Sequence, residues 1–157
     1  MEEIVGALLC DKSLWLAVAE SCTGGIISAR ITNMAGSSRY FKGAVVAYSN
    51  EVKRELLSLS PGMLDRFGAV SPETAAGMAQ GVRGRIGADI GLSVTGIAGP
   101  TGGTEEKPVG TVFIAVCDAK QVTTHDLHFT GDRETVRARS AEKALEALRD
   151  FLQALGG

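Results

Sequence analysis

The alternation of short apolar runs with helix-like patterns constrains the fold of this chain more than any other feature of its sequence. Three runs have the length and apolar composition of strands that are buried on both faces: residues 14–19, 43–49 and 88–96. Stretches with helical spacing or helix-start signals lie before and between them: residues 2–12, 23–33, 50–59 and 71–87. Helices that connect successive buried strands favour parallel pairing with right-handed crossovers.

The last third of the chain adds a hairpin and a long helix. Residues 111–118 and 122–129 are strand-like and separated by a short turn, which predicts an antiparallel hairpin. The second of these strands alternates polar and apolar residues, as an edge strand does. Residues 131–155 then carry one apolar face in helical spacing. The whole pattern predicts an α/β fold, a three-layer α/β/α sandwich with a mixed, mostly parallel five-stranded sheet, in a single domain of residues 1–157.

Capping residues predict where two of the helices begin. Asn50 is the expected N-cap of the helix after the second strand, and Pro61 is expected to end that helix. Ser71 is the expected N-cap of the next helix, because Pro72 suits the first helical position. A Gly/Pro/Thr-rich loop follows the third strand at residues 97–110, and loops of this length in compact domains are usually functional or disordered.

Charge and cysteine content exclude several classes of function. The formal net charge is −2, from 16 basic and 18 acidic residues, so we expect no nucleic-acid partner. Three cysteines without CxxC spacing argue against a disulfide framework or a zinc site, and His125 and His128 would lie on opposite faces of one strand. The acidic start and the lack of a run of about 20 apolar residues predict neither a signal peptide nor a membrane span. We therefore expect a cytoplasmic, metal-free protein.

Polar residues gather in "AESCTGG", where the first strand is expected to end and a helix to begin. Backbone amides of a first helical turn have no partner within the helix, so this junction predicts a site for an oxyanion or a phosphate. Ser21 lies there and becomes a nucleophile if a base accepts its proton, although it can also serve only as a cap. Cys22 is a rival nucleophile, since helix N-termini lower thiol pKa values, but no histidine lies in these segments to pair with it.

Lys53 is the base that the sequence offers. It lies in the first turn of the predicted helix after the second strand, where the helix dipole disfavours a positive charge. That field, together with partial burial, would lower its pKa towards neutrality, and Ser–Lys pairs are an established alternative to Ser–His–Asp. The alternative is a solvated lysine beside Glu51 and Glu55.

Further polar groups are predicted at the same strand ends. Tyr48 and Ser49 end the second strand and Thr95 ends the third, so their hydroxyls are expected to enter one crevice beyond the sheet. Arg133 and Arg137 are four residues apart on one face of the last helix. They are suited to grip a phosphate or carboxylate, and ion pairs with neighbouring glutamates explain them equally well.

Four motifs resemble the CinA carboxy-terminal domain family, the PncC-type nicotinamide-nucleotide amidases: "AESCTGG", "GSSRYFKGAVVAYSNEVK", "VTGIAGPTGGTEEKPVGTV" and "GDRETVR". The resemblance runs from about residue 4 to 155. It implies a three-layer α/β/α fold and hydrolysis of the carboxamide of nicotinamide mononucleotide to nicotinate mononucleotide and ammonia, without a cofactor. It also implies self-association, and the chain is similar to the form without the amino-terminal domain that many CinA proteins carry.

The resemblance assigns roles to particular residues. The family's serine, lysine, tyrosine and threonine match the candidate catalytic residues Ser21, Lys53, Tyr48 and Thr95. Substrate binding is expected from the two glycine-containing turns, the residues around them and the family's arginine: Glu20, Cys22, Thr23, Gly24, Gly25, Ser49, Gly96 and Arg137.

Two other functions remain open at this stage. The chain could be a non-catalytic nucleotide-binding or regulatory module, because family names refer to competence and DNA damage. It could also be an amidase that acts on a different small amide.

Overall fold

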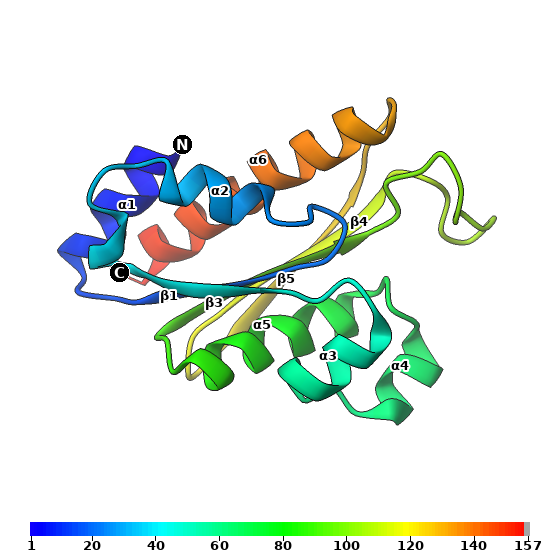
Figure 1. The fold of residues 1–157 in the computed structure, drawn as a ribbon, viewed down its shortest axis with the longest axis horizontal. Coiled ribbons are helices and arrows are strands. Elements are labelled where there is room, and N and C mark those ends of the chain that lie inside the picture. Colours follow the sequence, from blue (N-terminus) through cyan, green and yellow to red (C-terminus); the bar gives the residue numbers. More distant parts are fainter. Residues whose placement is uncertain (156–157) are drawn as a thin grey trace.

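The computed structural model describes residues 1–155, and its centre is a mixed sheet (Figure 1). Within these residues five strands pair in the order β2-β1-β3-β4-β5: β1 (Leu16–Glu20), β2 (Phe41–Val46), β3 (Ile90–Gly96), β4 (Thr111–Cys117) and β5 (Val122–His128). Strand β1 pairs in parallel with β2 and β3, whereas β4 is antiparallel to both β3 and β5. The predicted mixed, mostly parallel five-stranded sheet is therefore confirmed.

Helices cover both faces of this sheet (Figure 1). One layer contains α1 (Glu2–Asp11), α2 (Ile26–Thr32) and α6 (Arg133–Ala154). The opposite layer contains α3 (Asn50–Leu57), α4 (Pro61–Phe67) and α5 (Pro72–Ile86), and a short 3-10 turn, η1 (Ser37–Arg39), precedes β2. The predicted three-layer α/β/α sandwich is confirmed. No helix within residues 1–155 is both long enough and apolar enough to cross a bilayer.

The two faces of the sheet have different cores. Val18 faces the larger cluster, which contains apolar side chains of α1, α2 and α6, whereas Ala17 and Ala19 face the side of α3 and α5. Small residues bring α5 very close to its neighbours. A Cβ atom on Gly81 would lie 2.1 Å from the carbonyl oxygen of Leu57, so α3 and α5 are in backbone contact at this point.

Two of the predicted helix boundaries are wrong. Ser49, not Asn50, is the N-cap of α3, and its hydroxyl accepts a hydrogen bond from the amide of Val52 at 3.2 Å. Pro61 begins a helix as well as following one: Ser60 caps α4, and the proline occupies its first turn. Proline is tolerated there because the amide it lacks has no partner within a helix. Ser71 caps α5 as predicted.

The predicted helix over 23–33 begins three residues later, and this difference matters for the site. Gly24 and Gly25 have positive φ values of 59° and 105°, so residues 21–25 form a turn that precedes α2. Strand β2 likewise ends at Val46, before Tyr48. Both changes lengthen the segments that lie beyond the carboxyl ends of the strands.

Candidate active site

A cavity of about 260 Å³ opens beyond the carboxyl ends of β1, β2 and β3. Ligands of open α/β sheets bind at this edge, because the strand-to-helix connections leave a crevice there. Its walls come from the turn after β1, the segment after β2, the first turn of α3, the segment before α5, the loop after β3 and the first residue of α6. The lining residues are Ser21, Cys22, Tyr48, Lys53, Ala69, Val70, Thr95, Gly96, Ile97, Ala98, Gly99, Thr101, Gly102 and Arg133.

Ser21 and Lys53 lie next to each other in this cavity. The Ser21 Oγ and the Lys53 Nζ are 3.2 Å apart, and the two side chains are 8% and 1% exposed. Ser21 is fixed at the end of β1 because its amide donates to the carbonyl of Val94 on β3 at 3.0 Å. The predicted proximity of the hydroxyl and the amine is therefore present in the structure.

The surroundings of Lys53 favour a neutral amine. Burial lowers the pKa of the Lys53 ammonium below its ordinary value of 10.5. Nζ donates to the carbonyl oxygens of Ala47 at 2.9 Å and Tyr48 at 3.4 Å, and none of the ion pairs within residues 1–155 includes it. A neutral amine has enough N–H groups for these two carbonyls and keeps one lone pair, which can accept the proton of Ser21.

Glu20 occupies the place that the sequence assigns to a bound anion. Its buried carboxylate accepts hydrogen bonds from the amides of Gly25, Ile27 and Ser28 and from the hydroxyls of Thr23 and Ser28, at 2.6–3.1 Å. The predicted use of the first-turn amides of this helix for an oxyanion or phosphate is therefore wrong. A carboxylate of the chain itself already neutralises that end of α2.

Several residues that the sequence assigns to substrate binding do not line the cavity. Two of the eight do line it, Cys22 and Gly96. Glu20 and Thr23 are fully buried in the cap of α2, and Ser49 caps α3. The residues that the structure leaves outside the cavity are Glu20, Thr23, Gly24, Gly25, Ser49 and Arg137.

Arg137 holds the turn after Ser21 from outside. Its Nε donates to the carbonyl oxygen of Cys22 and its Nη2 to that of Thr23, both at 3.0 Å. These bonds hold the Cys22–Thr23 and Thr23–Gly24 peptide groups, and so the turn in which Cys22 lies. Within residues 1–155 the amide of Cys22, a lining residue, donates to no backbone acceptor, whereas Thr23 is fully buried outside the cavity.

Cys22 is not poised as a nucleophile. Burial raises the pKa of its thiol to about 12, and the side chain is only 5% exposed. The expectation of a lowered thiol pKa is therefore wrong, chiefly because burial disfavours the thiolate. The helix also begins further along the chain than predicted, and the Glu20 carboxylate makes a smaller unfavourable contribution.

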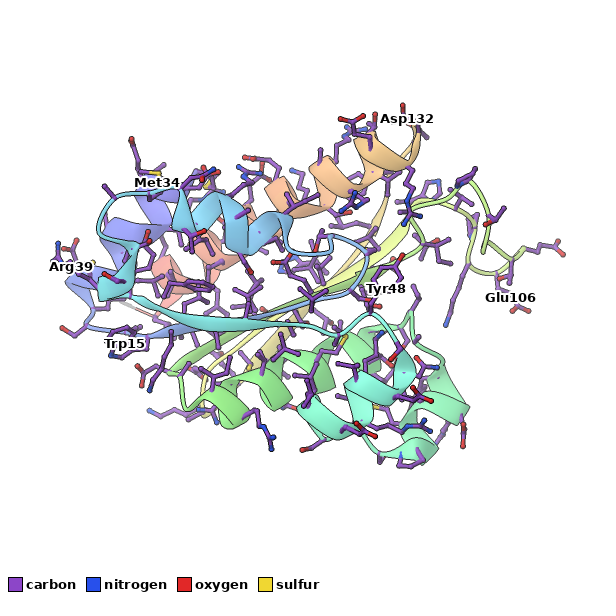
Figure 2. All side chains as sticks on the ribbon, in the orientation of Figure 1. Trp15, Met34, Arg39, Tyr48, Glu106 and Asp132 are labelled. Carbon is purple, nitrogen blue, oxygen red and sulfur yellow. The ribbon has the colours of Figure 1, made fainter. Side chains whose placement is uncertain are left out.

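Thr95 and Tyr48 line the cavity in different ways. Thr95 is 1% exposed, and its hydroxyl donates to the carbonyl oxygen of Ala69 at 2.7 Å. Tyr48 is 61% exposed at the rim (Figure 2), and its hydroxyl accepts a hydrogen bond from Nη2 of Arg133 at 3.0 Å. The hydroxyl of Thr95 thus belongs to the floor and that of Tyr48 to the mouth.

Sequence analysis missed two parts of this cavity. Ala69 and Val70, in the segment before α5, carry no chemical signal that would have revealed them. Arg133 lines the cavity in place of Arg137, and the sequence did single out this pair. Which of these two arginines reaches the cavity depends on where the helix begins relative to the sheet. Local sequence patterns do not specify that position.

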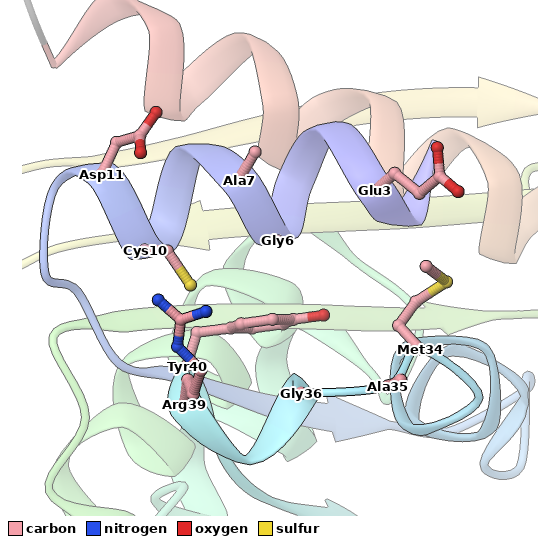
Figure 3. Close-up of a pocket in the computed structure, with 10 residues that line it drawn as sticks. All are labelled: Glu3, Gly6, Ala7, Cys10, Asp11, Met34, Ala35, Gly36, Arg39 and Tyr40. Atoms are coloured by element: carbon pink, nitrogen blue, oxygen red, sulfur yellow. The ribbon is translucent and has the colours of Figure 1, made fainter.

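A second hollow, of about 400 Å³, lies between α1 and residues 34–40 (Figure 3). Gly6 and Gly36 contribute to its walls, and the Tyr40 ring lies across it. Among its lining residues there is no hydrogen-bonded pair of nucleophile and base. The smaller cavity at the sheet edge is therefore the candidate reaction site. Within residues 1–155 no group of three or more His, Cys, Asp or Glu side chains could hold a metal ion.

The fold and the cavity define an α/β sandwich protein with a buried Ser–Lys pair at the carboxyl edge of its sheet. Residues 1–152 match the family model described as the CinA C-terminal domain, and the chain belongs to this family. A CinA-like protein of Thermotoga maritima is 50% identical over 153 residues, which cover 98% of this chain and 37% of that protein. A CinA-like protein of Desulfotalea psychrophila is 49% identical over 152 residues, 97% of this chain and 37% of its own length.

Solved structures share the whole fold. The competence damage-inducible protein A from Klebsiella pneumoniae superposes with a TM-score of 0.93 at 36% identity, covering 97% of this chain and 94% of that one. The competence/damage inducible protein from Agrobacterium tumefaciens gives 0.91 at 38% identity, again covering 97% and 94%. By contrast, the chain spans little more than a third of the length of the curated relatives it matches, 36% for a relative from Halothermothrix orenii.

Proposed function

We propose that this chain hydrolyses the carboxamide of nicotinamide mononucleotide, giving nicotinate mononucleotide and ammonia, with Ser21 as the nucleophile and Lys53 as the general base. The observation that carries the proposal is the 3.2 Å separation of the Ser21 Oγ and the Lys53 Nζ in a cavity at the sheet edge. Family membership and the motifs around these residues support the choice of substrate.

The first half of the reaction is acyl transfer to the serine. Neutral Lys53 accepts the hydroxyl proton as the Ser21 oxygen attacks the carboxamide carbon, giving a tetrahedral oxyanion. The Lys53 ammonium then returns this proton to the amide nitrogen, the carbon–nitrogen bond breaks, and ammonia leaves. The nicotinate mononucleotide ester of Ser21 and a neutral Lys53 remain.

The second half repeats these steps with water. Lys53 accepts a proton from a water molecule whose oxygen attacks the ester carbonyl, and the proton then returns to the departing Ser21 oxygen. The products are nicotinate mononucleotide and the free enzyme. The hydroxyls of Thr95 and Tyr48 line the same cavity, and we assign them to orienting the carboxamide and the attacking groups.

The amide of Cys22 is the proposed donor to the oxyanion. It follows the nucleophile directly, belongs to a residue that lines the cavity and donates to no backbone acceptor within residues 1–155. One such donor contributes about 3 kcal/mol to transition-state stabilisation in known cases. Arg137 becomes a positioning residue, because its hydrogen bonds to the carbonyls of Cys22 and Thr23 hold the turn that carries this amide.

The size of the cavity suits the reacting part of a nucleotide. Its volume of about 260 Å³ is below the about 300–1,000 Å³ that is usual for sites enclosing a drug-sized ligand. The pyridine carboxamide can occupy this space while the ribose and phosphate extend through the mouth.

The direct test is ammonia release from nicotinamide mononucleotide by the wild-type chain, with nicotinate mononucleotide measured in parallel. Ser21→Ala and Lys53→Met should each lower kcat by at least about 100-fold, because each removes one member of the proton-transferring pair. Lys53→Arg should be equally inactive, since a guanidinium stays protonated. Full activity of Ser21→Ala would rule out the assigned nucleophile.

Two further arms separate the alternatives. The first tests Cys22 as the nucleophile. Iodoacetamide at pH 7.5 should leave the activity intact, because the Cys22 thiol, with a pKa of about 12, is almost entirely protonated at that pH. Nucleotide binding without ammonia release would point to a regulatory module instead. Release of ammonia from another small amide, but not from the nucleotide, would retain the Ser–Lys chemistry and change the substrate.

A further inference from the structure

We infer that Arg133 binds the phosphate of the substrate and so makes the enzyme select a mononucleotide over the uncharged riboside, an inference that rests on the proposed amidase function. The geometry behind it is a guanidinium held across the mouth of the cavity that contains Ser21 and Lys53.

Arg133 connects two walls of the mouth. It is the first residue of α6, and its Nη1 donates to the carbonyl oxygen of Gly99 at 2.8 Å. Its Nη2 donates to the hydroxyl of Tyr48 at 3.0 Å. Gly99 belongs to the loop after β3 and Tyr48 to the segment after β2, so the guanidinium spans the entrance between them.

The positive charge of Arg133 is not neutralised by the chain. Both of its partners at the mouth are neutral oxygen atoms, and none of the ion pairs in the described part of the chain includes it. A guanidinium has N–H groups on every nitrogen, and Nε of Arg133 donates to no group within residues 1–155. This exposed side chain therefore has both charge and donors to offer to an anion.

The rest of the cavity wall contains no other charged group suited to this task. Among the described lining residues, Lys53 and Arg133 are the basic ones, and no acidic side chain is present. Burial lowers the pKa of Lys53 and favours its neutral form. Arg133 carries a full positive charge because a guanidinium is not deprotonated in proteins, so an anionic substrate group is attracted to the mouth.

The position of Arg133 also sets the direction of the substrate. The residue also lines a third hollow, of about 480 Å³ and here called the outer hollow, together with Ile26, Glu134, Arg137 and Ala138. A phosphate held by Arg133 would lie at the boundary, with the ring inside the smaller cavity. The carboxylate of Glu134 opposes an anion deeper in the outer hollow.

The neighbouring Arg137 is committed to a different task. Two of its nitrogens, Nε and Nη2, already donate to the carbonyls of Cys22 and Thr23. Its removal should disturb the turn after Ser21 and thereby the chemistry on any substrate. Substitution of Arg133 should therefore change the preference between substrates, whereas substitution of Arg137, one helical turn away, should slow the reaction of both.

The experiment compares kcat/KM for nicotinamide mononucleotide and nicotinamide riboside. Arg133→Met should lower kcat/KM for the mononucleotide by about 30-fold or more, which is the usual range for losing charge-assisted hydrogen bonds, and change the riboside value far less. Arg133→Lys should retain part of the preference, because it keeps the charge without the fork of donors. Arg137→Met should lower kcat on both substrates by the same factor.

Arg139→Met is the matched control. Arg139 lies on the same helix, stacks over the Phe129 ring at 5.4 Å, and lines neither the cavity of Ser21 and Lys53 nor the outer hollow. It should leave the ratio of the two kcat/KM values unchanged. An unchanged ratio in Arg133→Met, with wild-type-like thermal unfolding, would overturn the inference. The inference would also be overturned if Arg137→Met lost the preference for the mononucleotide over the riboside while Arg133→Met kept it.

A binding measurement tests Arg133 even if the proposed amidase function is wrong. If the wild-type chain releases no ammonia from either substrate, the proposed function fails, and calorimetry with nicotinate mononucleotide and nicotinate riboside then tests Arg133 alone. The wild-type chain should bind the phosphorylated compound more tightly, and Arg133→Met should bind both equally. Equal binding by the wild-type chain would overturn the inference.

Discussion

At the scale of single residues, the sheet topology brings Ser21 and Lys53 together, and a glycine-containing turn directs the Glu20 carboxylate onto α2. Ser21 and Lys53 follow neighbouring parallel strands, and the carboxyl ends of such strands meet at one edge, so their contact follows from topology. The role of Glu20 does not follow, because its carboxylate turns back onto α2 through a loop of two positive-φ glycines. Local sequence does not specify that conformation.

The lowered pKa of Lys53 predicts an acid limb in the activity profile. As pH falls through this lowered pKa, the amine becomes protonated and can no longer accept the proton of Ser21. We expect kcat/KM for the mononucleotide to fall about tenfold per pH unit below that point. A profile measured from pH 5 to 10 checks this, and a flat profile over the whole range would contradict the role of Lys53 as base.

The same group makes stability depend on pH. Between the lowered pKa in the folded chain and the ordinary value of 10.5, the unfolded chain holds one more proton on Lys53 than the folded chain does. The free energy of unfolding therefore rises with pH across this window. Urea unfolding at pH 7 and pH 10 should show the wild-type chain gaining stability relative to Lys53→Met, and a constant difference would contradict burial of a neutral lysine.

At the scale of elements, the cap of α2 is predicted to be a major contribution to stability. Glu20→Ala removes an acceptor shared by three amides and two hydroxyls, and it should lower the free energy of unfolding by at least about 3 kcal/mol. Asp89→Asn is the control, since within residues 1–155 this exposed carboxylate accepts one hydrogen bond, from the Trp15 amide at 2.8 Å, and the substitution should cost about 1 kcal/mol or less. Urea unfolding of both variants measures the difference, and similar losses would contradict the prediction.

Helix α5 offers a pair of glycines whose substitution should have opposite effects. A Cβ on Gly81 would lie 2.1 Å from the Leu57 carbonyl, so Gly81→Ala should lower the free energy of unfolding by about 1–3 kcal/mol. Gly84 has no neighbour within 4 Å, so Gly84→Ala should raise it by about 0.5–1 kcal/mol. Chemical denaturation of both variants measures the two free energies of unfolding. Equal changes in the two variants would contradict the close packing of α3 on α5.

Elements were more predictable than their ends. Apolar runs and helical spacing identified the strands and most helices, because those patterns arise from burial of one or both faces. Helix α4 was missed because Pro61 was interpreted only as the end of a helix, whereas Ser60 makes it the start of another. The shift of α2 to Ile26 was missed because two consecutive glycines fit a helix start and a left-handed turn equally well.

At the scale of the whole molecule, the site draws together both helical layers. Ser21 follows a central strand, Lys53 belongs to the layer of α3 and α5, and Arg133 begins α6 in the opposite layer (Figure 1). No single motif contains all three, so the complete site required the three-dimensional fold. Self-association of the chain stays a prediction, which light scattering of the purified protein measures.

A ligand that contacts all three layers should stabilise the molecule as a unit. At a concentration of about 100 times its Kd, a ligand specific for the folded state adds about 2.7 kcal/mol to the free energy of unfolding. For a chain of this size that corresponds to a rise in Tm of about 5–10 °C. Nicotinate mononucleotide should produce this rise in a single cooperative transition of the wild-type chain. Arg133→Met should lose most of it, because the link to α6 is gone, while Arg139→Met should retain it. A transition that splits in two, or an equal rise in both variants, would mean that the ligand is held by one layer only.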